Sequence, residues 1–313
     1  MTANNYQPAP AAVQTTKRTP TFLIIGVQKS GTTSIYHYLK QHPQVYMSPV
    51  KETNFFERDW QQATTEMQQR KKDGILTWER YQQLFNGANE NHIALGEASP
   101  NYMFHYRFAA EQIYQQLPKA KLIAVLRNPV QRAFSDYLMH VRDAVGQQTP
   151  LAEQVRSRGE SSHVLLKGKY YASLKHFMDI CGHDQVDVFL YDDLKQDSSQ
   201  FMQGIYQSIG VNPDFAVDTT KKAQTAKVPK NQTVNRLLKT QNPIRTVATG
   251  LMQVVPTQLR HQLRDRLIAI NSQTKSKAKF TEEDTILLRQ YYREDILKLQ
   301  DLLQRDLSAW LEE

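Results

Sequence analysis

Short apolar runs alternate with amphipathic stretches along most of the chain. Runs of four to six residues that end at turn-forming residues predict strands at 21–25, 92–95, 121–126 and 186–190. Apolar residues at helical spacing predict helices at 32–41, 106–117, 130–145, 170–180 and 281–311. Such alternation is typical of an α/β fold, in which a central, mostly parallel sheet is flanked by helices on both faces.

Three stretches fall outside this pattern. Residues 1–20 are rich in Pro, Ala, Thr and Gln and lack apolar periodicity, which predicts a disordered tail. Residues 60–90 are polar, and residues 219–279 are basic and rich in loop-forming residues, so both are predicted to be mobile or acceptor-facing insertions. The remaining length suits one large domain over residues 21–313.

The first predicted strand leads into a short basic turn. Gly26 and Gly31 allow a close backbone approach, Lys29 adds a full charge, and a helix is predicted to begin at about Thr32. The N-terminus of a helix presents unpaired backbone N–H groups and the positive end of the helix dipole, and both favour an anion. The turn is therefore predicted to bind phosphate.

Two departures from the usual nucleoside-triphosphate loop indicate which kind of phosphate is bound. In that loop the lysine follows the second glycine, whereas here Lys29 precedes Gly31. The strand at 121–126 runs into Arg127 and not into an aspartate that would hold magnesium. The pattern disfavours a nucleotide or sugar kinase. It favours a donor whose phosphates are neutralised by arginine, lysine and backbone donors, without a metal.

These segments resemble the nucleotide-binding motifs of sulfotransferases that use 3′-phosphoadenosine 5′-phosphosulfate (PAPS). Residues 26–33 resemble the 5′-phosphosulfate loop, and residues 126–137 resemble the 3′-phosphate segment. Residues 48–56 resemble the acid-x-x-Phe-Phe segment of heparan-sulfate-type enzymes, and residues 295–310 resemble the closing helix of bacterial members. The resemblance implies a P-loop-like three-layer α/β sandwich. It also implies transfer of a sulfuryl group from PAPS to a hydroxyl or amine, more specifically of a carbohydrate or glycoconjugate.

The resemblance further implies a set of donor contacts. The 5′-phosphosulfate is expected to meet the loop residues Gln28, Lys29, Ser30, Gly31, Thr32 and Thr33. Arg127 and Ser135 are expected at the 3′-phosphate, since an unpaired guanidinium beside a buried strand would be costly without an anion. A buried Arg–Asp pair is the alternative for Arg127. Three further contacts are expected on the rest of the nucleotide, namely Tyr170 (or its neighbour Tyr171), Lys227 and Lys230.

Two residues are candidates for the chemistry itself. Lys29 is predicted to stabilise the charge that builds on the bridging oxygen of the donor, with ground-state phosphate binding as the alternative. Glu52 is the candidate general base, and the rings of Phe55 and Phe56 are predicted to form an apolar wall that raises its pKa. A surface glutamate paired with Lys51 is the alternative.

Glu97 is a candidate substrate contact on the resemblance alone. It lies in a segment that resembles the Glu-Lys-Thr-Pro-x-Tyr segment of the heparan-sulfate-type enzymes. Ala98 stands where that segment has its lysine, so one contact expected in the catalytic or acceptor site is missing. His37 and His105 are alternative bases, although neither lies in a matching motif.

Charge and composition add the possible partners. The chain has 39 Lys and Arg against 31 Asp and Glu, for a net charge of +8, and residues 219–264 hold nine basic residues and no acidic one. This block suits the donor's phosphates, an anionic acceptor such as a carbohydrate or glycolipid, a membrane surface, or simply a solvated face. No nucleic-acid-binding motif accompanies it. The single Cys181 and the lack of a signal-like or membrane-spanning apolar run favour a cytoplasmic protein. A non-catalytic protein that binds anionic glycans or membranes remains the alternative to an enzyme.

Overall fold

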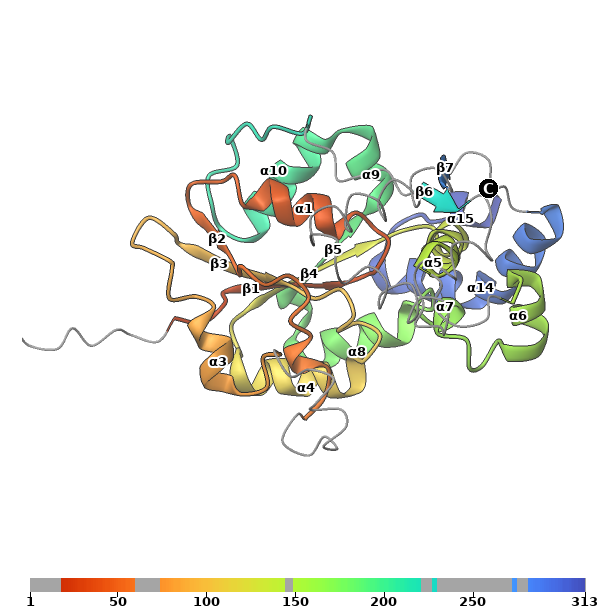
Figure 1. Cartoon of the computed structure of the whole chain (residues 1–313), viewed down its shortest axis with the longest axis horizontal. Coiled ribbons are helices and arrows are strands. Elements are labelled where there is room, and N and C mark those ends of the chain that lie inside the picture. The colour runs from red at the N-terminus through yellow and green to blue at the C-terminus, as the bar shows by residue number, and fades with distance from the viewer. Residues whose placement is uncertain are drawn as a thin grey trace, which may run out of the picture.

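The core of the structure is a five-stranded sheet in which every strand pair is parallel (Figure 1). The computed structural model describes residues 18–59, 74–143, 149–220, 227–229, 272–274 and 281–312. The strands lie in the order β2-β3-β1-β4-β5. Their bounds are β1 (Phe22–Gly26), β2 (Val45–Met47), β3 (Ala94–Ala98), β4 (Lys121–Leu126) and β5 (Val186–Leu190). Because β1 lies at the centre, the turn that follows it opens at the middle of the sheet's carboxyl edge.

Helices cover both faces of the sheet, which gives three layers (Figure 1). One face is covered by α3 (Trp78–Gln83), α4 (Tyr106–Gln116) and α8 (Tyr171–Cys181), and the other by α1 (Thr32–Leu39), α9 (Tyr191–Gln196) and α10 (Ser198–Ser208). A separate cluster of buried apolar side chains lies on each face. The predicted α/β architecture, with a parallel sheet between two helical layers, is confirmed.

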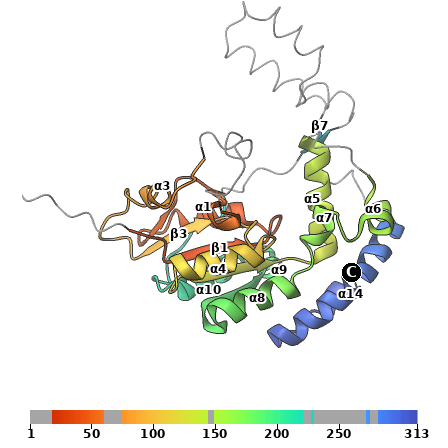
Figure 2. The same ribbon diagram turned by 90° about the horizontal axis from the view of Figure 1, so that it is seen from below.

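A second group of helices lies beside the sheet, at the end where β4 leads into α5 (Figures 1 and 2). It consists of α5 (Pro129–Asp143), α6 (Leu151–Arg158), α7 (His163–Leu166), α14 (Glu282–Leu303) and α15 (Ala309–Glu312). The long α14 packs against α5, α6 and α8, and so joins this group to the sheet. Its N-terminus has a capping box in which Thr281 and Asp284 exchange hydrogen bonds.

Two predicted elements differ from the structure, and one strand was not predicted. The strand predicted at 92–95 continues through Glu97 to Ala98, and β2 was not predicted at all. The helix predicted over 281–311 is two helices, because α14 ends at Leu303 and Gln304 adopts the left-handed conformation that closes many helices (φ 50°). Two short 3₁₀ turns, at Phe55–Glu57 and His183–Gln185, complete the described elements.

The predicted insertions are only partly described. In the first, residues 60–73 lie outside the described residues, and α3 packs into the core with Tyr81 and Phe85 fully buried. In the second, the structure describes an antiparallel pair of strands, β6 (Lys227–Pro229) and β7 (Ser272–Thr274), with β6 against α5. The predicted tail falls almost wholly on residues 1–17, which also lie outside. Among the described helices, none has the length and apolar character needed to cross a membrane.

Candidate functional site

The turn between β1 and α1 has the backbone of an anion-binding loop. The Val27 amide donates to the Val125 carbonyl at 3.0 Å, which holds the start of the turn against β4. Gly31 is the N-cap of α1 with φ 79°, a conformation that favours glycine. A Cβ at Gly31 would also lie 2.9 Å from Leu194 and 3.0 Å from Tyr191, so the position has no room for another residue. The backbone amides at the start of α1 therefore follow directly on a closely packed turn.

The side chains of this turn supply hydrogen-bond donors. Ser30 is fully buried, and its hydroxyl has no hydrogen-bond partner among the described residues. A buried polar atom without a partner is costly, so this hydroxyl suits an oxygen-rich ligand bound in the turn. Thr32 is buried at the start of α1, and Thr33 is exposed. The structure thus has the donors that a phosphate group would need here.

Lys29 projects from the same turn. Its backbone is left-handed (φ 75°), and its ammonium lies 3.4 Å from the sulfur of Met139 on α5. Burial lowers the pKa of the Lys29 ammonium. A thioether is a weak acceptor, so the ammonium keeps most of its capacity to bind an anion.

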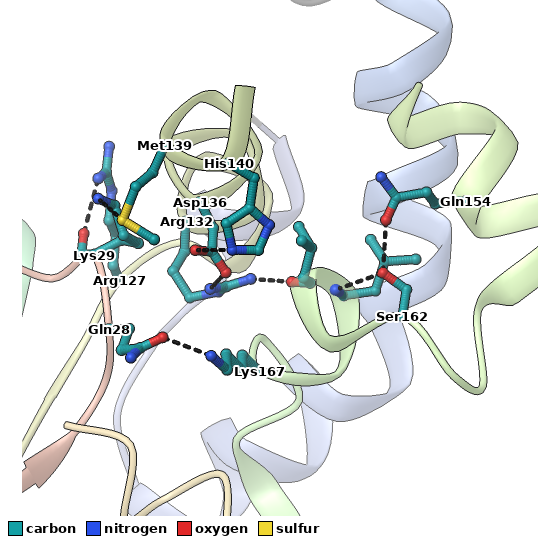
Figure 3. A network of polar contacts seen from close by, with 12 residues as sticks. Gln28, Lys29, Arg127, Arg132, Asp136, Met139, His140, Gln154, Ser162 and Lys167 are labelled. Atoms are coloured by element: carbon teal, nitrogen blue, oxygen red, sulfur yellow. Dashed lines mark hydrogen bonds and ion pairs between the residues drawn. The ribbon is translucent and has the colours of Figure 1, made fainter. Parts of the chain in front are cut away.

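Arg127 follows β4 and lies beside Lys29 (Figure 3). One of its nitrogens donates to the Lys29 carbonyl at 3.0 Å, and its guanidinium lies 4.8 Å from the centre of the Tyr191 ring. The Nε of Arg127 is buried and has no hydrogen-bond partner among the described residues. Burial lowers the pKa of the Arg127 guanidinium. No carboxylate lies within ion-pair distance of Arg127 in the described parts of the chain, and the buried Arg–Asp pair is instead Arg132 with Asp136. Arg127 therefore has the properties expected of an anion-binding residue.

The other residues predicted to meet the nucleotide lie in different settings. Tyr170 is buried and donates its hydroxyl to the Arg127 carbonyl at 2.8 Å, and its backbone amide donates to the Asp295 carboxylate of α14 at 2.7 Å. The hydrogen bond from the hydroxyl holds the backbone of Arg127 in position. Tyr171 is partly exposed, and Ser135 is half-buried on α5. Lys227 belongs to β6, whereas Lys230 lies outside the described residues. Direct contact of these residues with a nucleotide stays a prediction.

Glu52 lies at the same edge of the sheet, but not behind the predicted apolar wall. Its backbone amide donates to the Ala98 carbonyl at 2.9 Å, which places it beside the end of β3. Its side chain is 46% exposed and pairs with Lys51. The ring of Phe55 turns away and stacks on Tyr81 of α3, with 4.6 Å between the ring centres. The carboxylate is therefore accessible to an acceptor, and the two phenylalanines do not desolvate it.

The structure does not bring Glu97 to a surface where it could contact substrate. It is fully buried in β3, and its carboxylate accepts a hydrogen bond from Ser99. Burial raises the pKa of Glu97 to about 7, while hydrogen bonds from Ser99, Tyr102 and Thr53 act in the opposite direction. Glu97 has no exposed surface in this structure, so contact with an acceptor would require its surroundings to move.

One residue of the site was missed by the sequence analysis. Lys167, just after α7, donates from its ammonium to the side-chain oxygen of Gln28 at 2.6 Å (Figure 3). It thus brings a third positive group to the turn, after Lys29 and Arg127. The sequence did not indicate this contact, because Lys167 lies 139 residues away from Gln28.

Comparison with known proteins assigns the family. A model described as "Sulfotransferase family" matches residues 20–215, a span that contains β1 to β5 and the whole turn. The chain belongs to the sulfotransferase family. This confirms the family indicated by the two nucleotide-binding segments.

Several proteins are similar to this sulfotransferase. Human heparan sulfate glucosamine 3-O-sulfotransferase 6 is 36% identical over 121 residues, 39% of this chain and 30% of that protein. Human bifunctional heparan sulfate N-deacetylase/N-sulfotransferase 2 is 28% identical over 215 residues, 64% of this chain and 23% of that protein. The match thus spans less than a third of either relative. The crystal structure of a sulfotransferase from Alicyclobacillus acidocaldarius is similar with a TM-score of 0.67 and 27% identity, covering 94% of this chain and 99% of that one.

Glu97 makes the stability of this sulfotransferase depend on pH. With a pKa of about 7 when folded and 4.5 as the reference for the unfolded chain, folding takes up a proton between these values. The free energy of unfolding is therefore expected to fall as pH rises from 4.5 to 7, by up to about 3 kcal/mol. Urea unfolding of the wild type and of Glu97→Gln across this range measures the effect as the difference between the two curves. Parallel curves would show that Glu97 titrates normally.

Proposed function

We propose that this protein transfers the sulfuryl group of PAPS to a hydroxyl or amine of an acceptor molecule. The observation that carries the proposal is the buried Ser30 hydroxyl, which has no partner among the residues that the structure describes, in a turn between Lys29 and the left-handed Gly31. A phosphosulfate would satisfy this hydroxyl, the first amides of α1 and the Lys29 ammonium together. Arg127 at the neighbouring strand end offers a second anion site, which suits the 3′-phosphate of the same donor, with Ser135, Lys227 and Lys230 as further contacts.

The transfer needs a base and a positive group at the leaving oxygen. The acceptor oxygen or nitrogen forms a bond to sulfur as the bond between sulfur and the bridging oxygen breaks. The electron pair of the broken bond stays on the phosphate, which leaves as 3′-phosphoadenosine 5′-phosphate. Lys29 stabilises the charge that develops on the bridging oxygen, and Glu52 accepts the acceptor's proton. The exposure of Glu52 is compatible with this role, because the acceptor must reach it from solvent.

The same site suits a magnesium-dependent kinase less well. A kinase with this type of turn holds its metal through an aspartate after the neighbouring strand. Here β4 is followed by Arg127 and Asn128, and Asn128 uses its side-chain oxygen to cap α5 through the Val130 amide at 3.0 Å. A positive side chain, that of Arg127, therefore follows the strand where a metal-binding aspartate would be expected. It can neutralise a phosphate of the donor without a metal.

The class of acceptor is proposed from the relatives. Two of them carry heparan sulfate in their names, and each match covers less than a third of the relative's own length. On this basis a carbohydrate or glycoconjugate is the proposed acceptor. Glu97 and the basic residues between 219 and 264 are the candidates for selecting it.

Binding of the product nucleotide tests the donor. At a hundredfold excess over its dissociation constant, 3′-phosphoadenosine 5′-phosphate without magnesium is expected to raise the melting temperature by about 5 °C or more. ATP with magnesium at the same concentration is expected to raise it less. The opposite order would refute the proposal in favour of a kinase. Incubation with ³⁵S-labelled PAPS and a panel of oligosaccharides, glycolipids and phenols then identifies the acceptor.

The same assay tests the proposed general base with the variant Glu52→Gln. Loss of the carboxylate is expected to lower turnover about a hundredfold and to leave the affinity for 3′-phosphoadenosine 5′-phosphate unchanged. The exposed Glu79 of α3 provides the control, since Glu79→Gln removes a carboxylate far along the chain from the turn. Equal turnover in wild type and Glu52→Gln would rule out Glu52 as the base while leaving the donor assignment intact.

A further inference from the structure

Lys167 is a cation of the turn that neither the motifs nor the family assignment accounts for. Its ammonium donates to the Gln28 side-chain oxygen at 2.6 Å and lies 5.4 Å from the centre of the Phe104 ring. An ammonium has three donors, and the amide oxygen of Gln28 uses one. No carboxylate lies within ion-pair distance of Lys167 in the described parts of the chain. Two donors and a full charge are thus left for another group.

The segment that carries Lys167 is held firmly in place (Figure 3). Arg132 donates to the Val164 carbonyl, and the Tyr292 hydroxyl donates to the Leu165 carbonyl at 2.8 Å. A Cβ at Gly168 would lie 2.8 Å from the Tyr292 ring, so the chain passes closely against α14. Because the backbone on both sides is fixed, the ammonium reaches the turn at little further entropic cost.

Lys167 and Arg127 contact different residues of the turn. Arg127 contacts the turn through the Lys29 carbonyl, whereas Lys167 contacts it through Gln28. Burial lowers the pKa of the Lys167 ammonium, and the carboxylates near enough to oppose this include Asp136, Glu57 and Glu52. Lys167 thus contacts the turn through Gln28 and lies near enough to the proposed base, Glu52, to interact with its charge. The strand end nearest Glu52 adds no cation of its own, because β3 closes with Ala98.

We propose that Lys167 binds the sulfonate oxygens of the donor and, through Gln28, fixes that end of the turn. This inference rests on the proposed function. It gives the two lysines separate tasks: Lys29 acts at the bridging oxygen, and Lys167 holds the group that is transferred. A sulfonate held from the side of Glu52 is oriented for attack by an acceptor whose proton Glu52 removes.

A comparison of two nucleotides by calorimetry tests this assignment without an acceptor. PAPS carries the sulfonate, and 3′-phosphoadenosine 5′-phosphate lacks it. Lys167→Met is expected to weaken PAPS binding about ten- to a hundredfold, as for the loss of a hydrogen bond between charged groups, and to weaken binding of the other nucleotide less than about threefold. Lys167→Arg keeps the charge and is expected to recover most of the loss.

Lys169 provides the matched control. It lies two residues along the same segment, and its ammonium lies 4.5 Å from the centre of the Tyr291 ring, on α14. Lys169→Met is expected to leave both affinities unchanged. If Lys167→Met weakens both nucleotides equally, or neither, the inference is wrong and Lys167 only supports the turn. If the wild type binds neither nucleotide, the proposed function itself fails.

Discussion

Lys29→Met is expected to lower the turnover of PAPS by about a thousandfold while the protein remains folded. Methionine keeps most of the length of the side chain and removes its charge and its hydrogen-bond donors. The backbone conformation at this position is left-handed (φ 75°), and lysine and methionine tolerate it about equally. The fold is thus expected to lose little. The reaction loses the group that stabilises charge on the bridging oxygen, an interaction that is strongest in the transition state.

The measurement is steady-state turnover with PAPS and the best acceptor of the panel, together with the melting temperature of each variant. Lys29→Arg is expected to keep partial activity, since it restores the charge with a different geometry. The exposed Lys40 at the end of α1 is the control, and Lys40→Met is expected to behave as wild type. A Lys29→Met protein with turnover within threefold of wild type would show that Lys29 only binds ground-state phosphate.

The sheet could be predicted from the sequence because its central strands are buried on both faces. A strand of this kind is an unbroken apolar run, as at β1 and β4, and the structure has it within a residue of the predicted bounds. β3 was predicted too short because Gly96 and Glu97 interrupt its apolar run. Glu97 can remain in a buried strand because Ser99 hydrogen-bonds to its carboxyl group, and burial raises its pKa to about 7, which favours the protonated form. β2, with three residues, is too short to leave a pattern.

The site could be predicted only where it is local in sequence. The turn at residues 26–33 and Arg127 each follow a strand, so their spacing places them at one edge of the sheet. The position of Lys167 depends on how α5, α7 and α14 pack, which no short motif encodes. The apolar wall predicted behind Glu52 was wrong for a related reason. Phe55 instead packs against α3, where its ring stacks on Tyr81 and lies beside Trp78.

Arg132→Met is expected to cause the largest loss of stability, about 3–5 kcal/mol in the free energy of unfolding. Arg132 and Asp136 form an ion pair at 3.0 Å, with 0% and 1% of their side chains exposed. Removing the guanidinium leaves a buried carboxylate whose nearest remaining cation, His140, lies 3.8 Å away and is charged only when protonated. It also leaves the Val164 carbonyl without its donor, which loosens the segment before Lys167.

Urea unfolding at pH 8 gives the free energy directly. Arg132→Met combined with Asp136→Leu removes both charges, so it is expected to recover more than half of the loss. The exposed pair between Arg156 and Glu283 is the control, and Arg156→Met is expected to cost less than about 1 kcal/mol. A loss as small for Arg132→Met would mean that water reaches Asp136 in solution.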